Sequence, residues 1–113
     1  MKTGISEGIW GEITEVFEKF PKINQVILFG SRAMGNFREG ADIDLAVMGD
    51  LIVLEDLLDI EVALEDLELI YKFDLVDFNK INNHELTVHI ERVGMVVYSR
   101  KMNEIHHNAI KSS

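Results

Sequence analysis

The stretch that decides the fold is "ILFGSRAMGNFREGADIDLAVMGD", residues 27–50. Its opening apolar run ends at Gly30 and Ser31, which predicts a strand that turns into a short helix. After ten further residues, Asp42 and Asp44 begin a second run in which acidic and aliphatic residues alternate. That alternation predicts a strand with both acids on one face and aliphatic core residues on the other.

The segments on either side of this stretch show helical or strand periodicity in turn. Helices are expected over residues 6–19, which Pro21 closes, and over residues 51–70. Strands are expected over residues 72–78 and 95–99, with a helix over 82–94 between them. This order predicts an α+β fold, a mixed sheet of about four strands with helices packed on one face.

The composition is that of one globular domain. The chain has 113 residues, 47% of them hydrophobic, and no apolar run approaches the ~20 residues of a membrane span. Residues 1–100 are expected to form the domain, and residues 101–113 a tail that is a frayed helix or disordered. Because the N-terminus lacks the apolar segment of a secretory signal, a cytoplasmic protein is expected.

The charge argues against a nucleic acid as a direct partner. The net charge is −9, whereas phosphate backbones are held mainly by clustered Lys and Arg. From Glu39 to Tyr71 there are eleven acids and no base, so the negative excess lies in one third of the chain. No membrane partner is expected either, and the absence of cysteine excludes a thiolate metal site.

Asp74 is the third acid of a candidate metal site. The long helix joins the strand that starts at Asp42 to the strand that contains Asp74, and such a crossover leaves its strands parallel. If the strands are neighbours, Asp42, Asp44 and Asp74 meet at one corner of the helix-free face. Asp77 points the other way and is the weaker candidate. Three carboxylates within ~4 Å would repel by about 4 kcal/mol per pair, so Mg²⁺ or Mn²⁺ is expected there.

The turn before the two acids suits a phosphate group. Gly30 lets the backbone approach a ligand, Ser31 donates a hydrogen bond, and an open helix N-terminus favours an anion. Two divalent ions can clamp the attacking and the leaving oxygen of a phosphoryl displacement. The sequence therefore predicts metal-dependent phosphoryl chemistry between the turn and the acids.

The spacing of Gly-Ser, ten residues and then Asp-x-Asp resembles the signature of the DNA polymerase β nucleotidyltransferase superfamily. The short chain, with "GSRAMG" and "DIDLAV", is most similar to the minimal nucleotidyltransferases, the antitoxins of MNT/HEPN toxin–antitoxin pairs. The resemblance implies that three acids are catalytic and hold two Mg²⁺ ions, and that three residues of the turn bind ATP. By number these are Asp42, Asp44 and Asp74 for the metals, and Gly30, Ser31 and Arg32 for the nucleotide.

The same resemblance implies an activity and a partner, namely transfer of AMP from ATP to a tyrosine of a HEPN ribonuclease toxin. Asp74 would lie nearest the acceptor hydroxyl. Three alternatives stay open: an antitoxin that neutralises by binding alone, transfer to a small molecule such as an aminoglycoside, and a response-regulator receiver domain. The receiver is disfavoured because receivers gather their acids at the C-terminal ends of strands, whereas here the acids lie at strand starts.

The chain departs from the family pattern at two positions. Ala41 stands where a serine is usual, and Met34 where a basic residue is usual, which leaves the nucleotide affinity open. Arg38 is a further candidate for a phosphate contact, although a solvated loop arginine is commoner. The four histidines are assigned no role; they are His84, His89, His106 and His107.

Two other metal or phosphate motifs do not fit the stretch. An EF-hand would need Gly and Glu where Val47 and Val53 stand, and a Walker A loop would need Gly-Lys.

The long helix carries more apolar residues than one buried face uses. Besides its core stripe it has a second apolar arc among many of the acids, made of Leu51, Leu54, Leu58, Val62 and Leu69. We expect this arc to meet a partner, either a second copy of the chain or a basic toxin.

Overall fold

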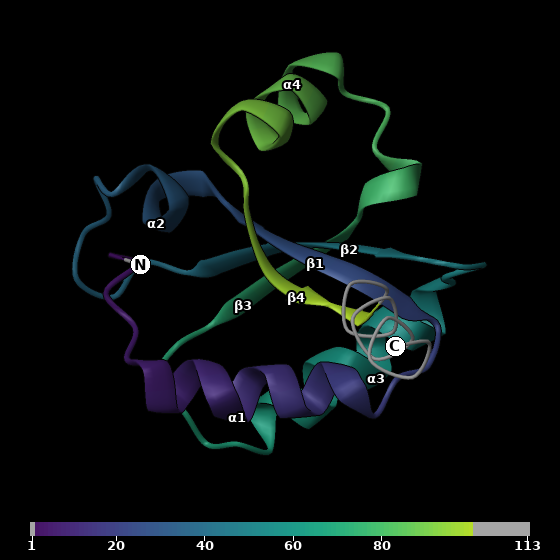
Figure 1. Cartoon of the computed structure of the whole chain (residues 1–113), viewed down its shortest axis with the longest axis horizontal. Helices are drawn as coiled ribbons and strands as arrows, with labels where there is room; N and C mark the ends of the chain where they lie inside the picture. The colour runs from purple at the N-terminus through teal and green to yellow at the C-terminus, as the bar shows by residue number, and fades with distance from the viewer. Residues whose placement is uncertain (1, 101–113) are drawn as a thin grey trace, which may run out of the picture.

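The computed structural model describes residues 2–100, which form a four-stranded sheet of order β3-β2-β1-β4 (Figure 1). The strands are β1 (Ile23–Phe29), β2 (Ile43–Gly49), β3 (Phe73–Asp77) and β4 (Met95–Ser99). The helices are α1 (Glu7–Glu18), α2 (Gly30–Met34), α3 (Leu54–Glu65) and α4 (His84–Val93), with a 3-10 turn η1 (Phe78–Lys80). Because β1 is antiparallel to β2 and β4 while β2 is parallel to β3, the sheet is mixed and the predicted α+β class is confirmed.

The main core lies between one face of the sheet and helices α1 and α3, which Figure 1 shows on the same side. The aliphatic face of β2 supplies Ile43, Leu45 and Val47, all fully buried. They meet Ile60 and Leu64 of α3, which are also fully buried. The period of two along β2 therefore directs its apolar residues into the core and its acids to the opposite face.

Helix α4 packs on that opposite face, which differs from the expectation that helices cover one face only. Its Ile90 packs against Phe29 and Ala46, with Val76 and Leu86 around them. On the faces of β2 and β3 that begin with acids, the next residues are the apolar Ala46 and Val76. This part of the sheet is therefore more stable when a helix shields it from water. The acids lie at the starts of these two strands, where Asp42 and Asp74 are exposed and Asp44 is half-buried.

Helix α3 is shorter than the helix predicted over residues 51–70. Leu51 and Glu68 have φ angles of 54° and 55°, a left-handed conformation that a right-handed helix cannot include. The chain therefore turns before Leu54 and after Glu65. As a result Leu69, which was expected on the second apolar arc, packs against the core instead.

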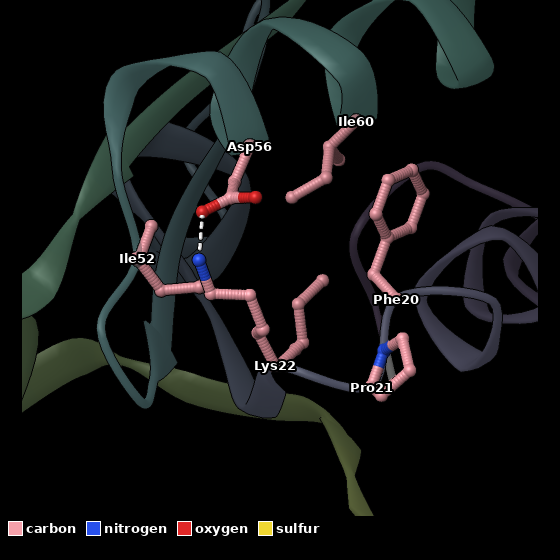
Figure 2. Close-up of a pocket in the computed structure, with 7 residues that line it drawn as sticks. Phe20, Pro21, Lys22, Ile52, Asp56 and Ile60 are labelled. Carbon is pink, nitrogen blue, oxygen red and sulfur yellow. Dashed lines mark hydrogen bonds and ion pairs between the residues drawn. The ribbon is translucent and has the colours of Figure 1, made fainter.

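The start of α3 is tied to the loop that follows α1. Asp56 accepts a hydrogen bond from the Val53 N–H at 2.8 Å and forms an ion pair with Lys22 at 2.6 Å, drawn in Figure 2. The hydrogen bond from Lys22 holds the pKa of Asp56 below its ordinary value. Beside this pair lies a small hollow of about 130 Å³ with Phe20 and Ile60 in its wall. The hollow is a packing gap between the loop and α3.

Two further predictions concern the ends and the environment of the chain. The predicted tail, with His106 and His107, lies outside the described residues. Across residues 2–100, no helix is long and apolar enough to cross a membrane.

Candidate active site

The register of β2 and β3 brings the predicted acids to one corner of the sheet. Asp44 and Asp74 are direct partners in the parallel ladder, so their side chains share a face on neighbouring strands. Asp42 precedes β2 by one residue and lies two residues before Asp44. Asp42 and Asp74 are exposed and Asp44 is half-buried. The structure thus places Asp44 and Asp74 side by side on neighbouring strands, with Asp42 at the start of the same corner.

Asp77, the weaker candidate, serves a local turn. Its buried carboxylate accepts a hydrogen bond from the Asn79 N–H at 3.1 Å and lies 3.9 Å from Nζ of Lys80. This carboxylate caps η1 and does not join the other three acids.

The three carboxylates influence one another electrostatically. Burial raises the pKa of Asp44 above its ordinary value, and the negative charges of Asp74 and Asp42 raise it further. The positive charge of Arg32 acts in the opposite direction. A cation placed among the acids would therefore relieve a repulsion that the fold imposes on Asp44.

The donor chemistry of this corner fits a hard divalent cation. Carboxylate oxygens are the ligands that Mg²⁺ and Mn²⁺ prefer. Among the described residues, no three His, Cys, Asp or Glu side chains are gathered closely enough to form a finished metal site. Mutual repulsion favours such an open arrangement of acids. The metal-binding roles of Asp42, Asp44 and Asp74 accordingly stay a prediction.

Gly30 forms the junction between β1 and α2, directly against Asp44. Its φ of 73° lies in the left-handed region that favours glycine, and a Cβ at this position would collide with Oδ2 of Asp44. The Gly30 backbone can therefore lie beside the acid only because it has no side chain. This explains why a glycine precedes Ser31 in the predicted phosphate turn.

His89 also belongs to this corner, although the sequence analysis gave it no role. Its Nε2 accepts a hydrogen bond from the Gly30 N–H at 3.2 Å, and its ring meets the Phe29 ring edge-on at 6.3 Å between centroids. The imidazole thus occupies one backbone N–H of the turn that was expected to bind phosphate. The sequence feature that could have identified His89 is helical periodicity, because His89 shares one face of α4 with Leu86 and Ile90.

Arg32 is buried beneath the site, with 2% of its surface exposed. Its Nε and Nη2 donate to the Ala41 carbonyl at 3.1 and 2.9 Å, and its Nη1 donates to the Thr3 carbonyl at 2.8 Å. Its guanidinium lies over the rings of Phe37 and Tyr71, at 4.8 and 5.0 Å from their centroids. These contacts hold the Ala41 carbonyl, which belongs to the residue directly before the first predicted metal ligand. The nucleotide contact expected of Arg32 stays a prediction, in competition with this positioning role.

An open hollow of about 470 Å³ lies beside the predicted phosphate turn. Its lining comes from α2 and the loop before β2, and consists of Ser31, Met34, Asn36, Arg38, Glu39, Gly40 and Ala41. Arg38 is exposed and is the only cationic residue in this lining, since Met34 stands where the family pattern has a base. Arg38 is therefore better placed than Arg32 to meet an anion in the hollow.

Comparison with known proteins identifies the family. Residues 11–103 match the family described as polymerase beta, nucleotidyltransferase, and the chain belongs to this family. The predicted superfamily and the class of enzyme, a nucleotidyltransferase, are thereby confirmed. No curated protein is similar enough to count as a match.

Several solved structures share the fold. A toxin–antitoxin complex with AMP-PNP is 23% identical over 85% of this chain and 78% of that chain, with a TM-score of 0.67. A tri-AMPylated Shewanella oneidensis HEPN toxin in complex with MNT antitoxin matches at 20% identity and a TM-score of 0.64, covering 88% of this chain and 77% of that chain. The toxin–antitoxin MntA-HepT matches at 20% identity and 0.64, covering 87% and 76%. At these identities the likeness shows the fold.

Proposed function

We propose that this chain is the antitoxin of a HEPN toxin. With Mg²⁺, it transfers AMP from ATP to a hydroxyl of that toxin, and a tyrosine hydroxyl is the first acceptor to test. The observation that carries the proposal is the pairing of Asp44 with Asp74 beside the Gly30 turn. Membership of the family supports nucleotidyl transfer. The similar complexes that contain AMP-PNP and an AMPylated HEPN toxin support ATP as donor and the toxin as acceptor.

The reaction joins the acceptor oxygen to the α-phosphorus of ATP, breaks the bond from that phosphorus to the bridging oxygen, and releases pyrophosphate. When bound by the three acids, Mg²⁺ supplies positive charge for the phosphates and for the attacking oxygen. Asp74 is exposed on the edge strand β3, so an incoming hydroxyl reaches it most easily and loses its proton to this carboxylate. Ser31 and the Gly30 amide hold the triphosphate, which therefore has to replace His89 at that amide.

Transfer of label from ATP tests the proposal. ATP labelled at the α-phosphate, Mg²⁺ and the cognate HEPN toxin are incubated with the chain, with and without EDTA. We expect covalent label on the toxin, loss of toxin ribonuclease activity, and neither effect with EDTA. Inhibition of the toxin without label would instead support neutralisation by binding alone and contradict the transfer.

Replacing Arg38 with alanine is expected to raise the KM for ATP by about 10-fold with little change in kcat, because a charge-assisted phosphate contact is lost. The reason is that Arg38 lines the hollow beside Ser31. Steady-state transfer kinetics at saturating toxin measure the effect. Arg92→Ala, which removes an exposed charge from the end of α4, is the matched control. Equal KM values for both variants would remove Arg38 from the nucleotide site.

Replacing His89 with phenylalanine is expected to lower the KM for ATP by about 2- to 10-fold. The variant keeps a ring against Phe29 but frees the Gly30 amide, so the nucleotide no longer competes with a hydrogen bond worth about 0.5–1.5 kcal/mol. His84→Phe on the exposed start of α4 is the control. An increase in KM for His89→Phe would show that the imidazole binds the nucleotide rather than competing with it.

A further inference from the structure

We propose that α3 carries a docking ridge for a basic amphipathic helix of the toxin, on the side of the sheet opposite the carboxylates. The ridge consists of Leu51, Leu54, Leu58 and Val62. The identity of the partner rests on the proposed function, whereas the chemistry that the ridge demands follows from its own residues.

The ridge is a continuous apolar line on the outer side of α3. Leu54, Leu58 and Val62 are each four residues apart, so they follow one another along the helix surface. They are 67%, 50% and 55% exposed, and Leu51 in the preceding turn is 88% exposed. The buried side of the same helix is formed by Ile60 and Leu64. The ridge consequently points away from the sheet.

Leu51 gives a second reason to expect a partner. Its φ of 54° is a left-handed conformation that glycine or asparagine adopts at lower cost than leucine. A large apolar side chain is therefore held in water at a position where the backbone disfavours it. A partner that buries Leu51 would offset this cost.

The charge around the ridge selects the chemistry of the partner. Acids flank the ridge on both sides, with Glu61 and Glu65 along one side and Glu55 and Asp59 along the other. No Lys or Arg occurs between residues 39 and 71. A second copy of the chain would set acids against acids, which is unfavourable. A helix that carries an apolar stripe flanked by Lys or Arg residues complements both the apolar ridge and the acids beside it.

The ridge and the predicted catalytic acids lie on opposite faces of the sheet. Helix α3 packs on the face of Leu45, whereas Asp44 and Asp74 share the other face with Ala46 and α4. A partner docked on the ridge leaves the carboxylate corner open. Docking should therefore affect the concentration of toxin needed for transfer, and not the transfer step itself.

The experiment measures the affinity of the chain for the cognate HEPN toxin by titration calorimetry. We expect Leu58→Lys, and separately the pair Glu55→Lys and Asp59→Lys, to raise Kd by at least about 30-fold, the size of a hot-spot loss. The matched controls are Val96→Lys on β4, and the pair Glu12→Lys and Glu15→Lys on α1. All these side chains are exposed, so the melting temperature should change little, with a small decrease for Glu55→Lys because it opposes the dipole of α3.

Transfer kinetics on the same variants separate docking from catalysis. Ridge variants are expected to raise the KM for toxin and leave kcat at saturating toxin unchanged. Unchanged Kd for the ridge variants, absence of toxin binding by the wild type, or a ridge-dependent dimer of the free chain would each overturn the proposal. Failure of the proposed function looks different: the wild type would bind the toxin through the ridge yet transfer no label.

Discussion

Replacing Asp44 with asparagine is expected to lower the rate of AMP transfer by about 1000-fold or more, because the negative charge at the centre of the three predicted metal-binding acids is lost. Asp44 contacts the Gly30 turn and pairs with Asp74, so it joins the predicted phosphate site to the predicted metal site. Single-turnover transfer of label to saturating toxin measures the chemical step apart from binding. Asp66→Asn, an exposed acid after α3, is the control and should transfer at the wild-type rate.

The stability of the Asp44 variant separates loss of the site from loss of the fold. The pKa of Asp44 is raised by burial and by its acidic neighbours, so its charged form is disfavoured in the folded chain. Without metal, Asp44→Asn should therefore melt at or above the wild-type temperature. Mg²⁺ should stabilise the wild type and have little effect on the variant. An inactive variant that melts far below the wild type would make the kinetic result uninformative, and Asp44→Ser would then replace it.

Replacing Arg32 with alanine is expected to lower the free energy of unfolding by about 3 kcal/mol. The substitution leaves the carbonyls of Thr3 and Ala41 without their donor and opens a cavity between the Phe37 and Tyr71 rings. Arg32→Lys keeps the charge but not the forked geometry, so about half of the loss should remain. Urea unfolding measures both values.

The kinetics of the Arg32 variants decide between a positioning role and a nucleotide contact. If the residue acts by holding the Ala41 carbonyl, the KM for ATP should rise in both variants in step with their loss of stability, because lysine cannot reproduce the forked hydrogen bonds. An Arg32→Ala protein of wild-type stability with a KM for ATP raised about 10-fold would show that the guanidinium binds phosphate.

The acid pair could be predicted because it depends on local periodicity and a general rule of chain topology. Alternation fixed which residues of β2 face the core, and the long helix implied a parallel neighbour, which gives the pairing of Asp44 with Asp74. No information about side-chain packing was needed. The same reasoning could not place α4, because alternation does not show which helix packs on Ala46 and Val76; that depends on the contacts of Ile90.

The parts that the sequence did not reveal depend on contacts between distant residues. The hydrogen bond from Gly30 to His89 joins positions 59 residues apart, and that from Arg32 to Thr3 joins positions 29 apart. The early end of α3 has no glycine to announce it, because Glu68 adopts the left-handed conformation instead. Periodicity over residues 51–70 therefore overestimated the length of the helix.

The most direct test of the central claim is to locate a bound metal. Crystals of the chain soaked with Mn²⁺ and AMP-PNP would reveal the ion by its anomalous scattering. The account predicts anomalous density between the carboxylates of Asp42, Asp44 and Asp74, with the phosphates lying along the Gly30–Ser31 turn. Nucleotide and metal bound elsewhere, with the three acids free of metal, would contradict it.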